Sequence, residues 1–312
     1  MKKISGMIFS TVIMAAMFAG CGSTSSKEAA APAQEAAPSQ TQEAPKEEAK
    51  TFDGEITVVS REEGSGTRGA FIELLGIEQK NEAGEKVDLT SEEATITNST
   101  SVVITTVAGD DTAIGYISLG SLNDTVKALK IDGAPASVEA IKDGSYKIAR
   151  PFNIATSATA SETAQDFIKF ILSTEGQAVV EKAGYISAVE PSAFDGGKTS
   201  GKLTIAGSSS VTPVMEKIKE AYAAVNPNVE IEIQQSDSTT GMNSAISGIC
   251  DIGMASRELK DSETGAGLKP IVMAIDGIAI VVNNNNPTDE LAADDVKAVF
   301  MGETTQWSEL AK

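Results

Sequence analysis

One local pattern occurs three times in this sequence: a strand, then a loop rich in hydroxyl residues or glycine, then a helix. In the first unit, residues 55–60 alternate between apolar and polar side chains as a strand does, and the helix ends at Gly76. The three loops lie at residues 61–68 (REEGSGTR), 207–213 (GSSSVTP) and 236–241 (SDSTTG). Strands that alternate with helices predict an α/β fold, in which helices begin at the carboxyl ends of strands.

Such loops are suited to anions. A helix N-terminus presents unpaired N–H groups and a partial positive charge, and Gly64 and Gly66 let a ligand approach the backbone closely. Arg61 and Arg257 follow predicted strands and add guanidinium groups. Hydroxyl residues at the three helix starts are Ser65, Thr67, Ser208, Ser209, Ser210, Ser238, Thr239 and Thr240. Taken singly each loop is an ordinary capped turn, but together they favour one site for a tetrahedral oxyanion.

Charge and composition restrict the function. The 312 residues include 44 acidic and 25 basic ones, a formal net charge of -19, which argues against a nucleic acid or an anionic membrane surface as partner. Histidine is absent, which excludes Ser-His-Asp and Cys-His catalysis and histidine-bearing zinc sites. We expect no metal and no cofactor.

The N-terminal region predicts export. Lys2 and Lys3 precede an apolar run, so residues 1–20 are interpreted as a signal peptide. Residues 18–21 resemble a bacterial lipobox that makes Cys21 the lipidated first residue, although Phe18 stands where leucine is more usual; the alternative is a secreted protein with a chance cysteine. Residues 21–51 are predicted to be a disordered tether. Cys250 is expected to be a buried thiol, so no disulfide is predicted.

Three stretches carry a resemblance to a known family: residues 207–213, residues 251–259 (DIGMASREL) and residues 60–68 (SREEGSGTR). The chain resembles the phosphate-binding protein of the phosphate-specific ABC importer. The resemblance implies a type II periplasmic-binding-protein fold, two α/β lobes with a ligand cleft between them, and a monomer that delivers phosphate to a membrane permease. It also implies these ligands: Arg61, Ser65, Gly66 and Thr67 from one lobe, and Ser209, Ser210, Val211 and Ser238 from the other.

The order of the stretches departs from the family pattern, in which the 207–213 loop comes first. The chain therefore resembles a circular permutant, with the old ends joined through about residues 190–201. One lobe is then expected at 149–282. The other is expected to combine 52–148 with 283–312.

Selectivity for phosphate needs a hydrogen-bond acceptor, because phosphate at neutral pH keeps a proton that sulfate lacks. Some family members have an aspartate where Arg257 stands here. Asp276 is our first candidate for the acceptor, with Asp237 and Glu258 behind it. The structural alternative for Asp276 is a turn or bulge residue beside Gly277.

The leading hypothesis is a lipid-anchored receptor that closes around inorganic phosphate by hinge motion. A receptor for sulfate, molybdate or another oxyanion is the nearest alternative. A sensor or adhesin that keeps the fold without transport remains open. A serine hydrolase is disfavoured, because no Ser-x-x-Lys pair lies beside the three loops.

Overall fold

A nine-stranded mixed sheet forms the framework of residues 52–310, the part of the chain that the computed structural model describes. The predicted signal peptide, Cys21 and the tether lie outside these residues. The strands follow the order β10 (Val229–Ser236), β9 (Gly201–Ser208), β11 (Ile252–Ala255), β8 (Ala149–Thr156), β12 (Lys269–Asn283), β5 (Ala113–Ser118), β1 (Thr57–Arg61) and β4 (Thr95–Thr97), and β6 (Val126–Ala128) also pairs with β12. The predicted α/β class is confirmed.

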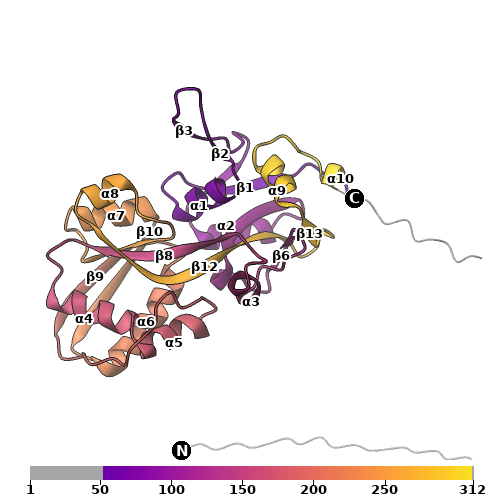
Figure 1. The fold of residues 1–312 in the computed structure, drawn as a ribbon. Helices are drawn as coiled ribbons and strands as arrows, with labels where there is room; N and C mark the ends of the chain where they lie inside the picture. The colour runs from indigo at the N-terminus through magenta and orange to yellow at the C-terminus, as the bar shows by residue number, and fades with distance from the viewer. Residues whose placement is uncertain (1–51, 311–312) are drawn as a thin grey trace, which may run out of the picture. The chain divides into compact units, whose positions relative to one another are not determined.

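Strands β8 and β12 connect two lobes, as Figure 1 shows. They pair antiparallel, with Asp276 opposite Arg150. The first part of β12 packs into one hydrophobic cluster through Met273 and Ala274, and its last part packs into another through Ile278 and Ile280. We therefore define lobe 1 as residues 149–276 and lobe 2 as residues 52–148 with 277–310.

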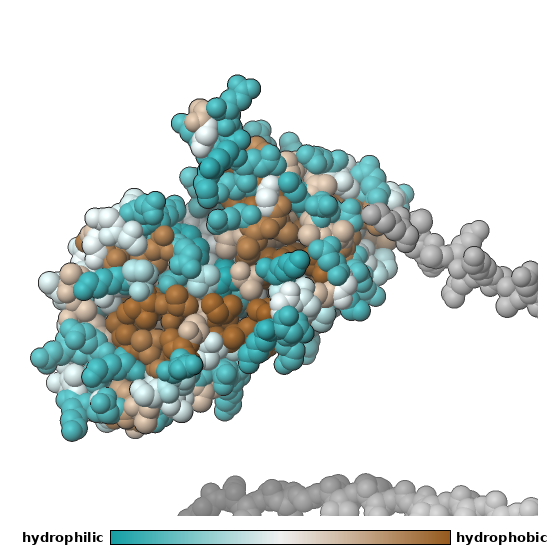
Figure 2. Space-filling model, viewed as in Figure 1, coloured by the Kyte–Doolittle hydropathy of each residue, from teal (hydrophilic) through white to brown (hydrophobic). Residues whose placement is uncertain are grey.

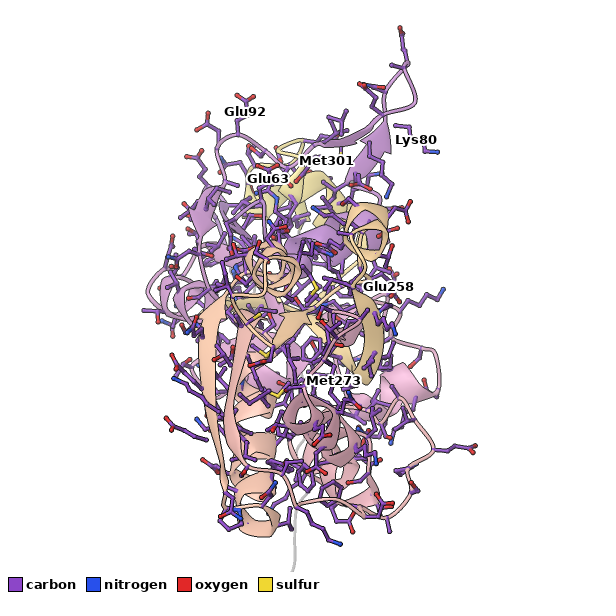
Figure 3. The ribbon with its side chains drawn as sticks, turned by 90° about the vertical axis from the view of Figure 1, so that its left-hand side faces the viewer. Glu63, Lys80, Glu92, Glu258, Met273 and Met301 are labelled. Carbon is purple, nitrogen blue, oxygen red and sulfur yellow. The ribbon has the colours of Figure 1, made fainter. Side chains whose placement is uncertain are left out.

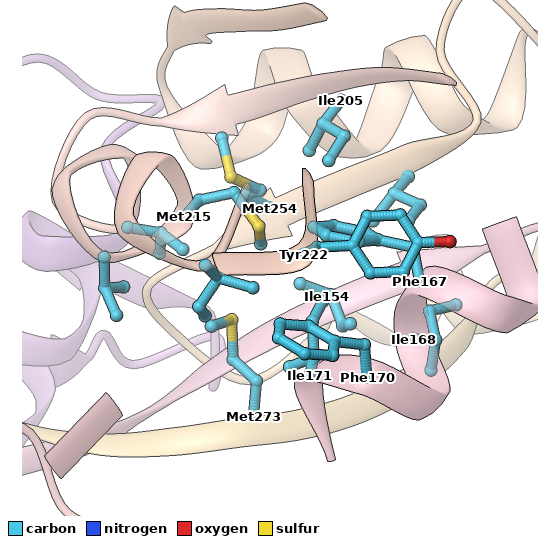
Figure 4. Packing of buried hydrophobic residues seen from close by; sticks show 14 of the residues in the cluster. Ile154, Phe167, Ile168, Phe170, Ile171, Ile205, Met215, Tyr222, Met254 and Met273 are labelled. Atoms are coloured by element: carbon cyan, nitrogen blue, oxygen red, sulfur yellow. The ribbon is translucent and has the colours of Figure 1, made fainter. Parts of the chain in front are cut away.

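Lobe 1 carries helices on both faces of its sheet, as an α/β layer requires. One face is covered by α4 (Glu162–Ile171), α5 (Thr174–Lys182) and α6 (Thr212–Val225), whose apolar residues surround Tyr222 and Met273 (Figure 4). Helix α7 (Ser238–Ile246) covers the other face together with Cys250. Burial raises the pKa of the Cys250 thiol to about 11. The short helix α8 (Asp261–Gly265) follows β11.

Lobe 2 is built around a cluster of three aromatic rings. Phe71 of α1 (Gly66–Leu74) stacks on Tyr116 of β5 with ring centroids 4.0 Å apart, and Phe300 of α9 (Ala293–Phe300) meets Phe71 edge-on at 4.7 Å. The remaining elements are α2 (Thr100–Ala108), the 3-10 turn η1 (Leu119–Ser121), α3 (Val138–Lys142), α10 (Trp307–Leu310) and a small sheet of β7 (Lys130–Ile131) and β13 (Glu290–Leu291).

The polar segment after α1 forms a hairpin of β2 (Glu78–Lys80) and β3 (Lys86–Asp88). It projects from lobe 2 in Figure 1, and Figure 2 shows mainly hydrophilic residues on it. The sequence predicts no strand here, because an exposed hairpin has no apolar face to produce alternation. Its tip carries little apolar surface.

The two ends of the described chain lie next to each other in lobe 2. The Trp307 amide donates to the Gly54 carbonyl at 3.0 Å, and the Ile56 amide donates to the Thr305 carbonyl at 2.8 Å. The Phe52 and Trp307 rings are 5.9 Å apart. Within residues 52–310, no helix combines the length and hydrophobicity that crossing a membrane requires.

Candidate functional site

The starts of four helices meet where the two lobes contact each other. Helices α1 and α2 bring lobe 2 residues, and α6 and α7 bring lobe 1 residues. Local sequence explains the geometry: Ser65 and Ser99 cap α1 and α2, and Asp237 caps α7 by accepting from the Thr240 amide at 2.9 Å. In the view of Figure 3, Glu258 is labelled at a height between those of Met273 of lobe 1 and Met301 of lobe 2.

Arg61 extends from the end of β1 across to lobe 1. Its guanidinium is buried, and its Nη2 donates to Ser209 Oγ at 3.1 Å. Glu62 accepts from Nε and Nη2, both at 2.7 Å, which fixes the guanidinium in one plane. The remaining nitrogen, Nη1, is 3.5 Å from Thr100 Oγ1. Arg61 therefore serves as a bridge between the lobes.

The hydroxyl group of Thr67 lies at the centre of the site. It is 2.8 Å from Ser210 Oγ and 3.3 Å from Ser256 Oγ. It also accepts a hydrogen bond from Arg150 Nη2 at 2.9 Å. Since all three partners belong to lobe 1, Thr67 joins the two lobes at one buried oxygen atom.

A second set of contacts comes from α2. The Thr100 amide donates to Ser209 Oγ at 3.3 Å, and Thr100 Oγ1 is 3.0 Å from Ser210 Oγ. Behind them, Ser238 Oγ accepts from the Ser256 amide at 3.1 Å. The cluster of hydroxyls thus comprises Thr67, Thr100, Ser208, Ser209, Ser210, Ser238 and Ser256, which we call the hydroxyl cluster.

Glycine at two positions permits this close approach. A Cβ on Gly64 would overlap the Asp237 carboxylate of lobe 1, and the Gly64 carbonyl accepts from the Thr239 amide at 3.2 Å, a backbone bond between the lobes. A Cβ on Gly66 would overlap Ser238 Oγ and would lie 2.8 Å from Ser256 Oγ. The backbone of α1 therefore meets lobe 1 at a distance that no larger residue permits.

A buried ion pair adjoins the hydroxyl cluster where the chain crosses between lobes. Arg150 Nη1 is 3.2 Å from Asp276 Oδ2, and both side chains are almost fully buried. Burial raises the pKa of Asp276 to about 6, although the Arg150 guanidinium opposes the shift. Burial likewise lowers the pKa of Arg150, and the nearby Arg61 guanidinium lowers it further.

Most predicted ligands come together here: Arg61, Ser65, Gly66, Thr67, Ser209, Ser210 and Ser238 lie at the lobe contact, and Val211 is buried in lobe 1 behind its loop. Arg257 is different: its Nη1 and Nη2 pair with Glu263 at 2.9 and 2.7 Å, and Nη2 also donates to Thr239 Oγ1 at 3.2 Å, whereas it has no hydrogen bond to the hydroxyl cluster. Asp276 reaches the cluster only through Arg150. Asp237 caps α7, and Glu258 Oε2 accepts from Asn153 at 3.4 Å.

Thr100, Arg150 and Ser256 belong to the site but are not among the ligands that the sequence predicts. Thr100 directly follows Ser99, the N-cap of α2, so in the sequence it belongs to an ordinary capped helix start. Arg150 stands at the beginning of β8, whereas ligand sites in α/β sheets are expected at the carboxyl ends of strands. No neighbouring residue in the sequence indicates the partners of Arg150, which reach it through tertiary contacts.

Chemically the site is rich in donors. Arginine N–H groups, helix-start amides and hydroxyls converge, and no carboxylate has a hydrogen bond to the hydroxyl cluster within the described residues other than through Arg61 or Arg150. Two cavities flank it, one of about 350 Å³ beside Arg150 and Arg257 and one of about 280 Å³ beside Thr100 and Ser209. No group of acidic, cysteine or histidine side chains suited to a metal occurs in residues 52–310. The arrangement favours an anion with several acceptor oxygens.

Comparison with known proteins gives a consistent result. A family model described as a PBP superfamily domain matches residues 32–175 and 192–312. Phosphate-binding protein PstS 2 of Streptococcus agalactiae is 62% identical over 260 residues, covering 83% of this chain and 89% of the relative. PstS 2 of Streptococcus pneumoniae is 46% identical over 258 residues, or 82% and 88% of the two chains. The crystal structure of a phosphate-binding protein of a phosphate ABC transporter from Streptococcus pneumoniae aligns with a TM-score of 0.65 and 46% identity, over 83% of this chain and all of that one.

Proposed function

This chain belongs to the PstS family of phosphate-binding proteins within the PBP superfamily, and on that premise we propose that it binds inorganic phosphate outside the cytoplasm and delivers it to an ABC permease. One observation carries the proposal: Arg61 and Thr67 of lobe 2 meet Ser209 and Ser210 of lobe 1 at 2.8 to 3.1 Å. Phosphate oxygens are acceptors that suit such donors.

Hinge closure is the mechanism that we propose for capture. The lobes have separate apolar cores and are joined by β8 and β12, so they can move apart without disrupting either core. Opening exchanges the contacts of Arg61 and Thr67 with lobe 1 for water. An anion bound first to the helix starts of lobe 1 would then recruit Arg61 on closure.

Calorimetry of protein freed of phosphate tests the ligand. We expect phosphate to bind at one site per chain, and sulfate at equal concentration not to displace it. Displacement by sulfate or molybdate would identify a receptor for another oxyanion. Absence of binding to all three would contradict the proposal. Scattering measurements should show a smaller radius of gyration with phosphate than without it, as closure requires.

The further parts of the proposal concern partners and location. We infer a monomer anchored through a lipid on Cys21 that acts without catalysis, since serine hydroxyls without histidine have no ordinary base. Mass spectrometry of the mature N-terminus would reveal the lipid, and light scattering the monomer. Stimulation of the permease's ATPase by the loaded protein separates a transport receptor from a sensor.

We also infer the permuted order. The contact of Gly54 with Trp307 is what two new ends made in one lobe would give, and residues 190–200, before β9, contain no regular element. A variant that begins at residue 201, with residues 310 and 52 joined by a short linker, should fold and bind phosphate. Failure of that variant to fold would contradict this inference without affecting the phosphate proposal.

A further inference from the structure

We propose that Arg150, held by Asp276, is a positioning residue of the anion site: it fixes the Thr67 hydroxyl as a donor and supplies the second positive charge of the site. This inference rests on the proposed function, because it assigns how the same site holds its anion. It gives Arg150 the role that the sequence suggests for Arg257.

The contacts of Arg150 use each side of its guanidinium. Nε donates to the Ser256 carbonyl at 2.7 Å, Nη2 donates to Thr67 Oγ1 at 2.9 Å, and Nη1 faces Asp276 Oδ2 at 3.2 Å. The guanidinium carbon lies 5.2 Å from the centre of the Phe152 ring. Ring, carbonyl and carboxylate together leave the side chain one orientation.

The number of protons on each group determines whether Thr67 Oγ1 donates or accepts in each of its hydrogen bonds. An arginine N–H is only a donor, so Thr67 Oγ1 must be the acceptor in that bond. A hydroxyl has a single proton, and the proton of Thr67 is consequently directed to its other neighbours, on the side of Ser210. An acceptor oxygen of an anion that took the place of Ser210 Oγ in this contact would meet a donor that is already oriented.

Charge leads to the same conclusion. Burial lowers the pKa of Arg150, and the nearby Arg61 guanidinium lowers it further, so a second positive charge is disfavoured here. Glu62 balances Arg61 at the half-buried rim, and Asp276 balances Arg150 from the side remote from Thr67. A bound anion would lie between two like charges and relieve their repulsion.

Asp276 itself is supported from lobe 2. Its Oδ1 accepts from the Gly120 amide at 3.4 Å, at the crossing from lobe 1 to lobe 2. Arg257, in contrast, has both terminal nitrogens paired with Glu263 inside lobe 1. The two arginines therefore form a matched pair, one hydrogen-bonded to the hydroxyl cluster and one held by Glu263 and Thr239.

The test measures phosphate affinity by calorimetry in four variants: Arg150→Met, Thr67→Val, the double variant, and Arg257→Met as the matched control. We expect Arg150→Met and Thr67→Val each to weaken phosphate binding at least tenfold. The affinity of the double variant should be close to that of the single variant that binds phosphate less tightly. Non-additivity of this kind is the readout that a purely structural role would not give. Arg257→Met should change affinity less than threefold.

Two further variants distinguish a loss of binding from a loss of folding. Arg150→Lys should bind phosphate more tightly than Arg150→Met, because lysine keeps the positive charge but lacks the planar set of guanidinium donors. If Arg150→Met alone does not fold, Arg150→Met combined with Asp276→Asn removes both buried charges and gives the same comparison. Unchanged affinity in the Arg150 variants, or additive losses with Thr67→Val, would overturn the inference while wild-type binding still supports the phosphate proposal. Wild-type protein that binds no phosphate would instead overturn the proposed function.

Discussion

The Arg61 guanidinium donates to the hydroxyl of Ser209, 148 residues further along the chain and on the opposite lobe, at 3.1 Å. The two residues belong to lobes with separate hydrophobic cores, which no strand other than β8 and β12 connects directly among those described. A single charged hydrogen bond therefore reports whether the lobes are together.

Replacing Arg61 with methionine should weaken phosphate binding by about 10- to 100-fold, since a hydrogen bond to a charged group contributes about 1.5–3 kcal/mol. Calorimetry measures the loss. Lys219→Met, an equal change of charge on α6, is the control and should bind like the wild type. Equal effects of the two variants would indicate that only overall charge matters.

Gly66→Ala should prevent full closure, because its Cβ would meet Ser238 and Ser256. We expect at least tenfold weaker phosphate binding and a radius of gyration that phosphate no longer reduces. Gly69→Ala is the matched control three residues along the same helix, where the nearest atom to a new Cβ is Arg257 Cδ at 3.8 Å. That variant should bind normally and be slightly more stable. Normal closure in Gly66→Ala would contradict the fit described for this glycine.

Asp276 should make stability depend on pH. The pKa of Asp276 is about 6 in the folded protein and near 3.8 in the unfolded chain. Protonation of Asp276 therefore stabilises the folded state. Its contribution is complete below pH 3.8 and is lost as the pH rises through 6. Relative to Asp276→Asn, the wild type should therefore lose up to about 3 kcal/mol in the free energy of unfolding between pH 4 and 7.5. Urea titrations of both proteins measure the difference, and a difference that is constant with pH would refute the assignment.

The segment between α5 and β9 should contribute to stability but not to binding. Asp166 accepts from Tyr222 at 2.6 Å and from the Gly197 amide at 3.1 Å, which fastens this segment to lobe 1. Asp166→Asn should lower the free energy of unfolding by about 1–3 kcal/mol and leave phosphate affinity unchanged. Asp195→Asn, at an exposed position of the same segment, should alter neither quantity. A loss of affinity in Asp166→Asn would link the segment to closure.

The sequence was sufficient for features that depend on local chemistry. The strand before Arg61 and the helix that begins after Ser65 follow from alternation and from helix capping. Arg257 shows the limit of what local sequence can predict. Its place after a strand is local information, but the direction of its guanidinium depends on Glu263, whose pairing only the packed fold reveals.

Arg150 illustrates the opposite case. Nothing within ten residues of it predicts a partner, because Thr67, Ser256 and Asp276 reach it through tertiary contacts. The hairpin of β2 and β3 is not predicted for a different reason. Its residues are mostly exposed, so no buried face produces an alternation of apolar and polar side chains. Buried pairs and exposed hairpins are the features that require coordinates.

The pairing of Gly54 with Trp307 has a practical consequence for optical sensors. Dyes attached near residues 52 and 310 would both travel with lobe 2, so energy transfer between them would stay constant whatever the other lobe does. Moving one dye to the exposed Ile249, after α7, would place the two fluorophores on different lobes, whose distance the proposed closure would change. A biosensor built on this scaffold therefore needs an internal attachment point rather than terminal fusions.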